Sequence, residues 1–593
     1  MPNGSTETDW RTPAETTHYR TTPDYAETMA FLERLAAAHP DQVRIETFGR
    51  TGEGRELRVV IASKDGEFDP AAIHASGRVV LLVQNAIHAG EMDGKDACLA
   101  LLRDLLHQPE FAHLLEHVVL VFIPVYNIDG HERRSAHSRI NQTGPELAGW
   151  RANATNLNLN RDYVKAEAPE TRAFLRMFHR WMPDFFVDDH VTDGADFQYE
   201  VTFAIDDTAN VDPAIARWVR ETVTPEVARR VNASGHKTFP ALVYLKDDSD
   251  PAKGLVLHPN PPRFSTGYMI LENRPALLVE LHMLKEYRAR VTSNYEVLRA
   301  LLEVLHRESA HLVALNREAD AAAARLGAGT EPAEPVPLAL STGGGSTPVP
   351  FLGYRFTRQL SEVSGTVWVR FGHEPWEVTL PFEPLNKVTT SVVPPAAYIV
   401  PPQWTHVIEV LEVHDVRLLR TTAPWTGRVE RYRLRGLVWQ RAPFEGHHPM
   451  FRGEGSVAET ADTGTCTLST ETMTFPAGSV VVPLSQRLSK VAVHWLEPEA
   501  PDSAVRWGFF DPVFEQKEYG EPYVLETLAR EELARDPKLR AEFEHRVESD
   551  PSFAGNPTAR LEFFFDRSPW GRANRVGEYP VGRLRSLEGL PIP

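Results

Sequence analysis

The chain has 593 residues, and its shares of hydrophobic (42%) and charged (24%) residues are those of an ordinary globular protein. Its formal net charge of −18 argues against nucleic acid or an anionic membrane as a partner, because both are bound through basic patches. The two cysteines, Cys98 and Cys466, lie far apart, which excludes a disulfide framework and argues against a cysteine-based metal site.

Neither a membrane span nor a signal peptide is expected. The longest apolar stretch, Val118 to Val125, is far shorter than the ~20 residues that a membrane-spanning helix requires. Residues Met1 to Ser5 are not a charged segment followed by an apolar one, as a signal peptide would be. These features fit a cytoplasmic protein and equally a mature exported form whose signal has been removed.

The first half of the chain is expected to form an α/β domain. Residues 1–20 are polar, so we expect them to be disordered or loosely ordered, and a helical pattern follows between Pro23 and Pro40. Apolar runs and helical patterns then alternate, with strands at Val79–Val83, Val118–Val125, Phe185–Val187 and Ala276–Leu281, and helices at Asp96–Leu106 and Pro169–Trp181. This alternation predicts a mixed, mainly parallel sheet flanked by helices, with an active site at the carboxyl ends of strands.

A long helix and a linker are predicted to end this domain. Ser293 and Glu296 fit a capping box, and leucines at helical spacing follow them. Residues 327–350 are rich in proline and glycine, which is typical of a linker. We therefore predict a catalytic domain over residues 21–326 and a linker over residues 327–350.

The second half is predicted to be β-rich and then mixed. Residues 351–495 should form a β-rich accessory domain, interrupted by a short helix between Pro402 and Val413, with alternating strands at Thr366–Phe371, Tyr432–Trp439 and Ser479–Val482. Residues 496–593 should form an α+β segment that packs on the other domains, with a helical stretch at Tyr523–Val547 and a strand at Leu561–Phe565.

The stretch His88-Ala89-Gly90-Glu91 follows a predicted buried strand, where a histidine and a glutamate can bind one metal ion together. Such a pattern is frequent by chance. A catalytic zinc keeps three protein ligands, and two residues so close cannot complete the site, so a third must come from elsewhere. His190 after the strand Phe185–Val187 is the best source. Glu280 ends another apolar run and is the natural candidate for a base. Together they predict hydrolysis assisted by zinc. Eight further histidines are expected to be structural or solvated, namely His74, His107, His113, His131, His137, His236, His447 and His448.

Further motifs lie between the predicted ligands, namely Asn127-Ile128-Asp129-Gly130 and Asn158-Leu159-Asn160-Arg161-Asp162. In this combination and order, roughly residues 20 to 310 resemble the zinc carboxypeptidases of the carboxypeptidase A type. Stretches beyond residue 350 resemble the C-terminal portion of larger bacterial relatives. The resemblance implies a carboxypeptidase-like fold and one Zn²⁺ per chain, with His88, Glu91 and His190 as its ligands.

The resemblance also implies catalytic roles. Glu280 would be the general base toward the metal-activated water. Arg151, in Gly149-Trp150-Arg151, matches the arginine that stabilises the developing oxyanion.

Substrate contacts follow from the same resemblance. Arg161, with Asn160, would hold the C-terminal carboxylate of a peptide, since a planar guanidinium grips a carboxylate with two hydrogen bonds. Tyr268 is the candidate for the mobile tyrosine of the family, and Tyr244 is the alternative.

One residue departs from the family pattern. Asn158 stands where digestive members have an aspartate that orients a ligand histidine. An amide can accept a hydrogen bond from an imidazole but carries no charge, so His88 would be a less basic ligand.

Three functions are compatible with these residues. The first is a zinc-dependent exopeptidase that removes C-terminal residues from peptides with a free carboxylate. The second keeps the metal chemistry but acts as an amidase or deacylase, or on cell-wall peptides. The third is a non-catalytic binding protein, against which the intact ligand set and Glu280 argue.

Overall fold

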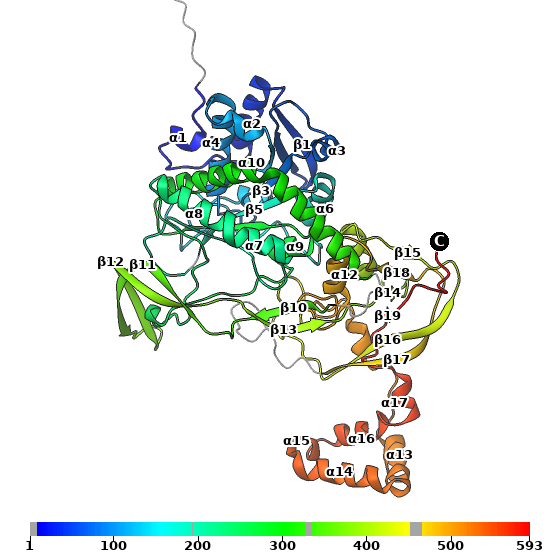
Figure 1. The fold of residues 1–593 in the computed structure, drawn as a ribbon. Helices are drawn as coiled ribbons and strands as arrows, with labels where there is room; N and C mark the ends of the chain where they lie inside the picture. Colours follow the sequence, from blue (N-terminus) through cyan, green and yellow to red (C-terminus); the bar gives the residue numbers. More distant parts are fainter. Residues whose placement is uncertain (1–8, 193, 328–333, 451–464) are drawn as a thin grey trace, which may run out of the picture.

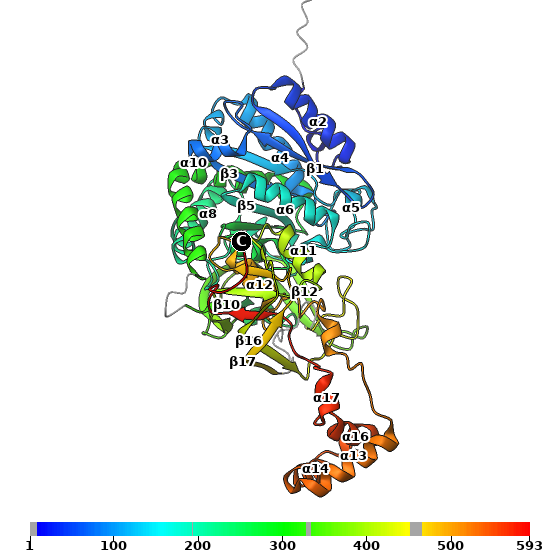
Figure 2. The ribbon, with the colours of Figure 1, turned by 90° about the vertical axis from the view of Figure 1, so that its right-hand side faces the viewer.

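The protein is described here by a computed structural model, which covers residues 9–192, 194–327, 334–450 and 465–593. Residues 1–8 of the predicted loose N-terminus and residues 328–333 of the predicted linker lie outside these ranges. Figure 1 shows an α/β body in blue to green, a β-rich body packed against it, and a small helical unit that projects from the far end. Figure 2 shows the same projection after a quarter turn.

The α/β body is built on an eight-stranded sheet with the order β1-β2-β4-β3-β5-β9-β6-β7. The four strands predicted from apolar runs lie side by side at its centre, and all three pairings among them are parallel. The strands are β1 Val43–Arg50, β2 Glu56–Ala62, β3 Val79–Gln84, β4 Val118–Ile123, β5 Phe185–Thr192, β6 Val201–Ile205, β7 Thr238–Phe239 and β9 Ala276–His282. The predicted mixed, mainly parallel sheet is confirmed.

Helices cover both faces of this sheet, which is why its central strands are apolar along their whole length. Within β3, Val79 and Leu81 belong to one core and Val80 and Leu82 to the other, as the alternation of a strand requires. The first core contains α2 Tyr25–Ala38, α4 Asp93–His107, α7 Pro213–Trp218, α8 Thr224–Ala233 and α10 Tyr287–Arg325. The second contains α3 Pro70–Ser76, α6 Pro169–Trp181 and α9 Ser265–Leu271.

The long helix begins at Tyr287, earlier than the predicted start at Ser293. Ser293 is no cap, because its hydroxyl donates back to the carbonyl of Arg290 inside the helix. Tertiary contacts stabilise the extra turns: the Tyr287 hydroxyl donates to Asp96 at 2.7 Å, and Arg290 Nε donates to Asp93 at 2.8 Å. Long-range pairing thus overrides a local start signal.

Two ranges expected to lack regular structure contain short elements. The N-terminal range holds α1 Pro13–Thr16, whose capping box joins Thr12 and Glu15. The predicted linker holds β10 Val336–Ser341, which pairs with β13 Lys387–Val392, so this range is not a linker throughout. Pro337 is compatible with β10 because the strand belongs to a two-stranded sheet and lies at its edge.

The region beyond residue 350 is β-rich. The hairpin of β11 Thr347–Leu360 and β12 Val367–Glu383 pairs with β8 Leu255–Val256 of the α/β body. A six-stranded sheet follows, with the order β15 Leu419–Arg420, β18 Val480–Pro483, β14 Ala397–Val400, β19 Gly582–Leu584, β16 Trp425–Arg435 and β17 Thr465–Phe475. Its helices are α11 Thr405–Val413 and α12 Ser489–Leu496. Because β19 lies between β14 and β16, residues on both sides of the predicted boundary at 495 share one sheet.

The helical unit corrects one expectation. Leu561–Phe565, predicted as a strand, forms the end of α16 Pro557–Phe565. The Asn556 side chain caps that helix and Pro557 occupies its first turn, while Phe563 and Phe564 pack on Phe553 in a small core. The other helices are α13 Pro522–Arg535, α14 Pro537–Ser549, α15 Pro551–Ala554 and α17 Pro569–Ala573, and the predicted helical stretch is confirmed.

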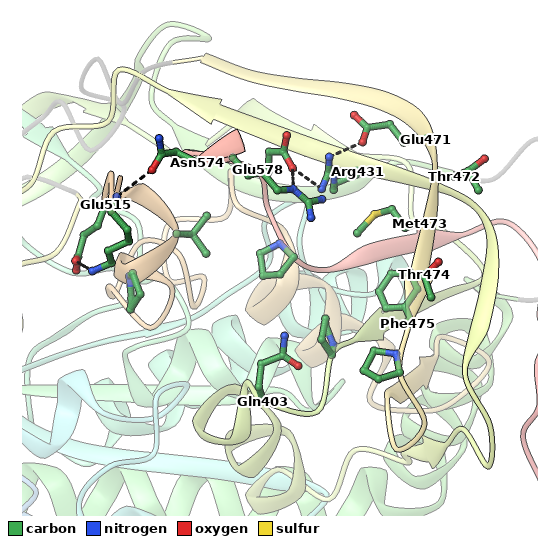
Figure 3. A pocket seen from close by; sticks show the side chains of 17 residues that line it. Gln403, Arg431, Glu471, Thr472, Met473, Thr474, Phe475, Glu515, Asn574 and Glu578 are labelled. Carbon is green, nitrogen blue, oxygen red and sulfur yellow. Dashed lines mark hydrogen bonds and ion pairs between the residues drawn. The ribbon is translucent and has the colours of Figure 1, made fainter. Parts of the chain in front are cut away.

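A cavity of about 620 Å³ lies between β17 and the base of the helical unit (Figure 3). The charged side chains in its wall pair with one another, since Arg431 bonds both Glu471 and Glu578. Among the described helices, none is both long enough and apolar enough to cross a membrane.

Candidate active site

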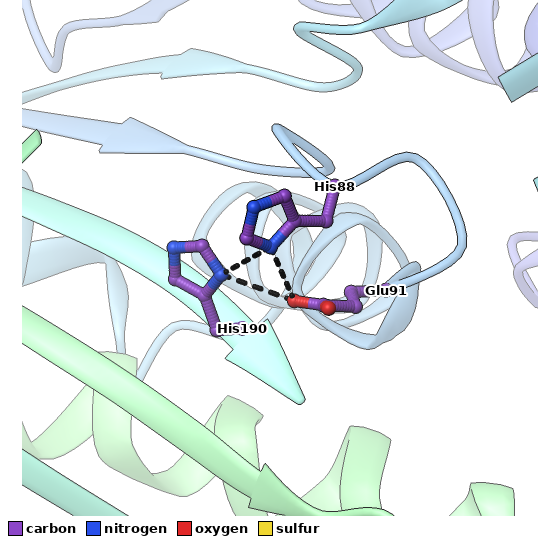
Figure 4. Close-up of side chains that lie close together, drawn as sticks. All are labelled: His88, Glu91 and His190. Carbon is purple, nitrogen blue, oxygen red and sulfur yellow. Dashed lines mark hydrogen bonds and ion pairs between the residues drawn. The ribbon is translucent and has the colours of Figure 1, made fainter. Parts of the chain in front are cut away.

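Three predicted metal ligands meet at the carboxyl end of the central sheet (Figure 4). His88 and Glu91 lie in the connection that follows β3, and His190 lies in the neighbouring strand β5. The Nδ1 atom of His190 is 3.1 Å from Nδ1 of His88 and 3.0 Å from Oε2 of Glu91, and His88 Nδ1 is 3.3 Å from the same oxygen. All three side chains are buried.

The two imidazole rings are oriented by oxygens on their far sides. His88 Nε2 is 3.0 Å from Asn158 Oδ1, and His190 Nε2 is 2.8 Å from Asp188 Oδ2. Both oxygens accept, which assigns the ring hydrogens to Nε2 and turns the Nδ1 lone pairs toward the centre. Two imidazole nitrogens and one carboxylate oxygen, each able to lie ~2.0–2.2 Å from a common point, are a donor set that fits Zn²⁺.

The electrostatic setting of these ligands is uneven. Burial lowers the pKa of His88 well below its ordinary value, and the charge of Arg151 adds to this. Burial also opposes charge on His190, but Asp188 and Glu91 outweigh it and raise the pKa of that imidazole. The pKa of Glu91 is lowered because its interactions with His88 and Arg139 outweigh its burial. Glu91 is therefore an ionised donor.

Two arginines contact the remaining oxygen of Glu91. Arg139 Nη1 lies 2.9 Å and Arg151 Nη1 3.4 Å from Glu91 Oε1. The side chain of Arg151 is 39% exposed whereas that of Arg139 is 10% exposed, so Arg151 is the one with freedom to move toward a substrate. Sequence reasoning missed Arg139, which no motif marks. Gly90 is required here, because a Cβ atom would lie 2.7 Å from the Gly149 carbonyl and 2.8 Å from the Arg139 side chain.

Glu280 lies beside the metal ligands. It pairs with His190 across the parallel strands β5 and β9, so both side chains project from the same face of the sheet. Glu280 is only partly buried, unlike its neighbours on β9. A carboxylate in this position can reach a water molecule that approaches the ligand cluster.

Arg161 and Asn160 lie in a short 3₁₀ turn, η2 Leu159–Arg161, close to the same site. Asn160 Oδ1 accepts from the Ser265 amide at 2.8 Å, and the Arg161 guanidinium stacks 3.9 Å from the centroid of Phe264. Burial and the charges of Arg151 and Arg263 lower the pKa of Arg161 to about 9. This concentration of positive charge favours an anionic ligand.

The two candidate tyrosines, Tyr268 and Tyr244, differ in their exposure to solvent. Tyr268 is fully buried in α9, with its hydroxyl 2.6 Å from Glu272 Oε1 and 2.8 Å from His414 Nδ1. This position does not fit the expected contact with substrate, because the side chain has no exposed surface. Tyr244, the alternative, is partly exposed and lies close enough to Arg161 to influence its pKa.

The C-terminal region contacts the segment that carries Asn158, Asn160 and Arg161. We call this segment the Asn158 loop (residues 158–168). Glu445 Oε2 accepts a hydrogen bond from the backbone N–H of Asn158 at 2.8 Å, and His447 Nε2 lies 2.8 Å from Glu167 Oε2. His414 Nε2 donates to the Val164 carbonyl at 2.8 Å. Sequence reasoning did not find these contacts, because Asn158 and Glu445 lie 287 residues apart in the chain.

Comparison with known proteins identifies the α/β body. Residues 28–210 match a family model described as zinc carboxypeptidase. Residues 28–210 therefore belong to a zinc carboxypeptidase domain. Carboxypeptidase 2 of Trichophyton equinum is 24% identical over 507 residues, covering 82% of this chain and 84% of that protein. Carboxypeptidase D of Mus musculus is 28% identical over 145 residues, covering 24% of this chain and 10% of that protein.

Solved structures with some similarity include carboxypeptidase A of Helicoverpa armigera, with 16% identity and a TM-score of 0.37 over 49% of this chain and 74% of that chain. A metallo-carboxypeptidase of Pseudomonas aeruginosa has 16% identity and a TM-score of 0.35 over 48% of this chain and 68% of that chain. The match to the fungal relatives extends well beyond the zinc carboxypeptidase domain, so part of the C-terminal region is common to them.

Proposed function

We propose that this metallocarboxypeptidase is a zinc-dependent exopeptidase that removes C-terminal residues from peptides. The observation that carries the proposal is the convergence of His88, Glu91 and His190 beside Glu280, with the guanidinium of Arg161 nearby. The peptide substrate would carry a free C-terminal carboxylate.

In this proposal, His88, Glu91 and His190 hold one Zn²⁺ at the catalytic site. Zinc, when bound, would polarise the scissile carbonyl and lower the pKa of water at the site to about 7. Glu280 takes a proton from the attacking water and later passes it to the leaving amine. Arg151, whose side chain is partly exposed, stabilises the oxyanion that forms as the carbonyl is attacked.

Arg161 and Asn160 bind the terminal carboxylate in this scheme. The stacking on Phe264 fixes the plane of the Arg161 guanidinium. The hydrogen bond from the Ser265 backbone N–H fixes the side-chain amide of Asn160. A planar guanidinium held in this way can make two parallel hydrogen bonds to a carboxylate. We assign the mobile tyrosine role to Tyr244 in place of Tyr268, because only Tyr244 has exposed surface.

We further propose that residues 21–326 form the catalytic domain and that the C-terminal region supports its substrate-binding segment. Glu445 and His447 hold the Asn158 loop, and Asp502 holds the Arg263 backbone and guanidinium at 2.8 and 3.0 Å. The two regions also share one hydrophobic core, which includes Phe174 on one side and Trp495 on the other.

A paired substrate experiment tests the exopeptidase. The zinc-loaded protein should release the last residue of a free peptide and leave the matching C-terminal amide intact, and a chelator should abolish release. Equal cleavage of both peptides would favour the amidase or deacylase alternative. Cleavage restricted to cell-wall peptides would favour the cell-wall form of that same alternative, and binding without cleavage would favour a non-catalytic protein.

A further inference from the structure

A second group of metal-ligating side chains lies on the surface, far from the catalytic ligands along the sheet. Glu116, His117 and His306 each offer a ligand atom, and these atoms lie within 4.8 Å of one another. Glu116 and His117 directly precede β4, at the amino end of that strand. His88 and Glu91 follow the carboxyl end of β3, and His190 lies near the carboxyl end of β5; both strands have the same direction as β4. The two groups therefore lie at opposite ends of the parallel strands.

The local fold brings a fourth donor to the group. The 3₁₀ turn η1 Ala112–Leu115 is closed by a hydrogen bond from the Glu116 amide to the His113 carbonyl at 3.0 Å. The turn therefore places His113 beside His306 of α10, with ring centroids 5.2 Å apart, while His117 lies 4.9 Å from the same ring. His113 and His117 thus both lie against the ring of His306, and the ligand atoms of Glu116, His117 and His306 lie close to one another.

The chemical state of these groups suits metal binding. His306 Nδ1 is buried and has no hydrogen-bond partner among the described residues. Partial burial and the neighbouring rings of His117 and His113 lower the pKa of His306. The hydrogen bond from Lys64 lowers the pKa of Glu116, whose carboxylate is therefore ionised. Neutral imidazole and ionised carboxylate are the forms that bind a metal.

We propose that Glu116, His117 and His306, with His113 as a fourth donor, form a second site for a divalent transition metal such as Zn²⁺. Imidazole nitrogen and carboxylate oxygen are ligands that zinc accepts in a tetrahedral arrangement. Bond lengths of ~2.0–2.2 Å require the side chains to draw closer, which their position at the surface permits. The bound metal ties the η1 turn to α10 and displaces Lys64 from Glu116.

Metal titration of the full chain tests this site without reference to peptidase activity. After removal of metal, equilibrium dialysis against Zn²⁺ should give two equivalents per chain, one tight and one weaker. His306→Gln and His117→Gln should each abolish the weaker equivalent and leave the tight one. His88→Gln should do the reverse. The weaker equivalent should also raise the melting temperature of the wild-type protein but not of His306→Gln.

His107→Gln is the matched control, because His107 also lies against another histidine, His39, at 3.3 Å but without a carboxylate ligand. It should retain both equivalents. Circular dichroism checks that each variant is folded. A wild-type protein whose single equivalent is lost in His88→Gln but kept in His306→Gln overturns the proposal, as does a weaker equivalent that survives in both His306→Gln and His117→Gln.

Discussion

His190 and Glu280 lie side by side on the neighbouring parallel strands β5 and β9. Adjacent strands lie about 4.8 Å apart, and backbone hydrogen bonds set that spacing. The proposed metal ligand and the proposed base are therefore held at a fixed separation by the sheet and not by contacts between their side chains. A substitution of the base should leave the ligand where it is.

The first prediction concerns Glu280. Glu280→Gln should retain zinc but lose activity by about 10²- to 10⁴-fold, the range for removal of a general base. Zinc content and steady-state rates on the same sample measure the two effects. Glu374→Gln, at an exposed position of β12, is the control and should be fully active. An active Glu280→Gln variant would mean that another group moves the proton.

The second prediction concerns Arg161. Removal of the guanidinium in Arg161→Ala should cost about 2–5 kcal/mol of binding for a peptide with a free carboxylate, since that charge would then be unpaired. The Michaelis constant should rise on the order of 30-fold or more. Arg530→Ala, on the exposed surface of α13, should have no effect. If Arg161→Ala leaves the preference for a free carboxylate over an amide unchanged, the carboxylate is bound elsewhere.

The third prediction concerns the contact between Asn158 and His88. Asn158→Asp keeps an oxygen that can accept from His88 Nε2 and from the backbone N–H of Asn160. It also adds a negative charge, which makes the His88 imidazole more basic. Zinc should bind more tightly to this variant, as competition with a chelator can measure. Asn158→Leu removes the acceptor and should weaken zinc binding about 10- to 100-fold. Equal affinities in all three proteins would show that Asn158 does not tune the ligand.

The fourth prediction tests the support from the C-terminal region. Glu445→Ala removes the acceptor of the Asn158 amide, and a hydrogen bond to a charged group contributes about 1.5–3 kcal/mol. We expect weaker zinc binding and a lower turnover number. Glu445→Gln keeps an acceptor oxygen and should retain most of both. Two variants with the same loss would indicate that the charge of Glu445, and not its hydrogen bond, matters.

The fifth prediction concerns acid stability. Burial lowers the pKa of both His414 and His494 from 6.5 to about 4. Between these values the unfolded chain binds more protons than the folded protein, so the free energy of unfolding falls as pH decreases through this interval. Urea unfolding at pH 7 and pH 5 measures the fall. His494→Gln should reduce it, whereas His137→Gln, at an exposed position, should not.

Much of the sheet and of the metal cluster could be predicted from the sequence. The central strands are apolar throughout because both of their faces are buried, and this gives a strong local signal. His88 and Glu91 follow such a strand directly, so their place at its carboxyl end was predictable. The contact between Asn158 and His88 followed from the family pattern alone.

The remaining contacts depend on residues that meet only after folding. Arg139 and Glu445 lie in irregular segments without a motif, and only tertiary structure brings them to Glu91 and Asn158. Tyr268 was misplaced because position along the chain does not show which way a helical side chain points. The aromatic run at the end of α16 favours a strand by its composition alone, whereas the cap at Asn556 that marks the start of a helix lies outside that run.

The insertion of β19 between β14 and β16 has a consequence for biosynthesis. Chains fold from the N-terminus as they emerge from the ribosome, so the catalytic domain can form first. The six-stranded sheet cannot be completed until residues 582–584 have been synthesised. The same holds for the surface that presents Glu445 to the Asn158 loop. Peptidase activity should therefore mature late, after the catalytic ligands have already been assembled.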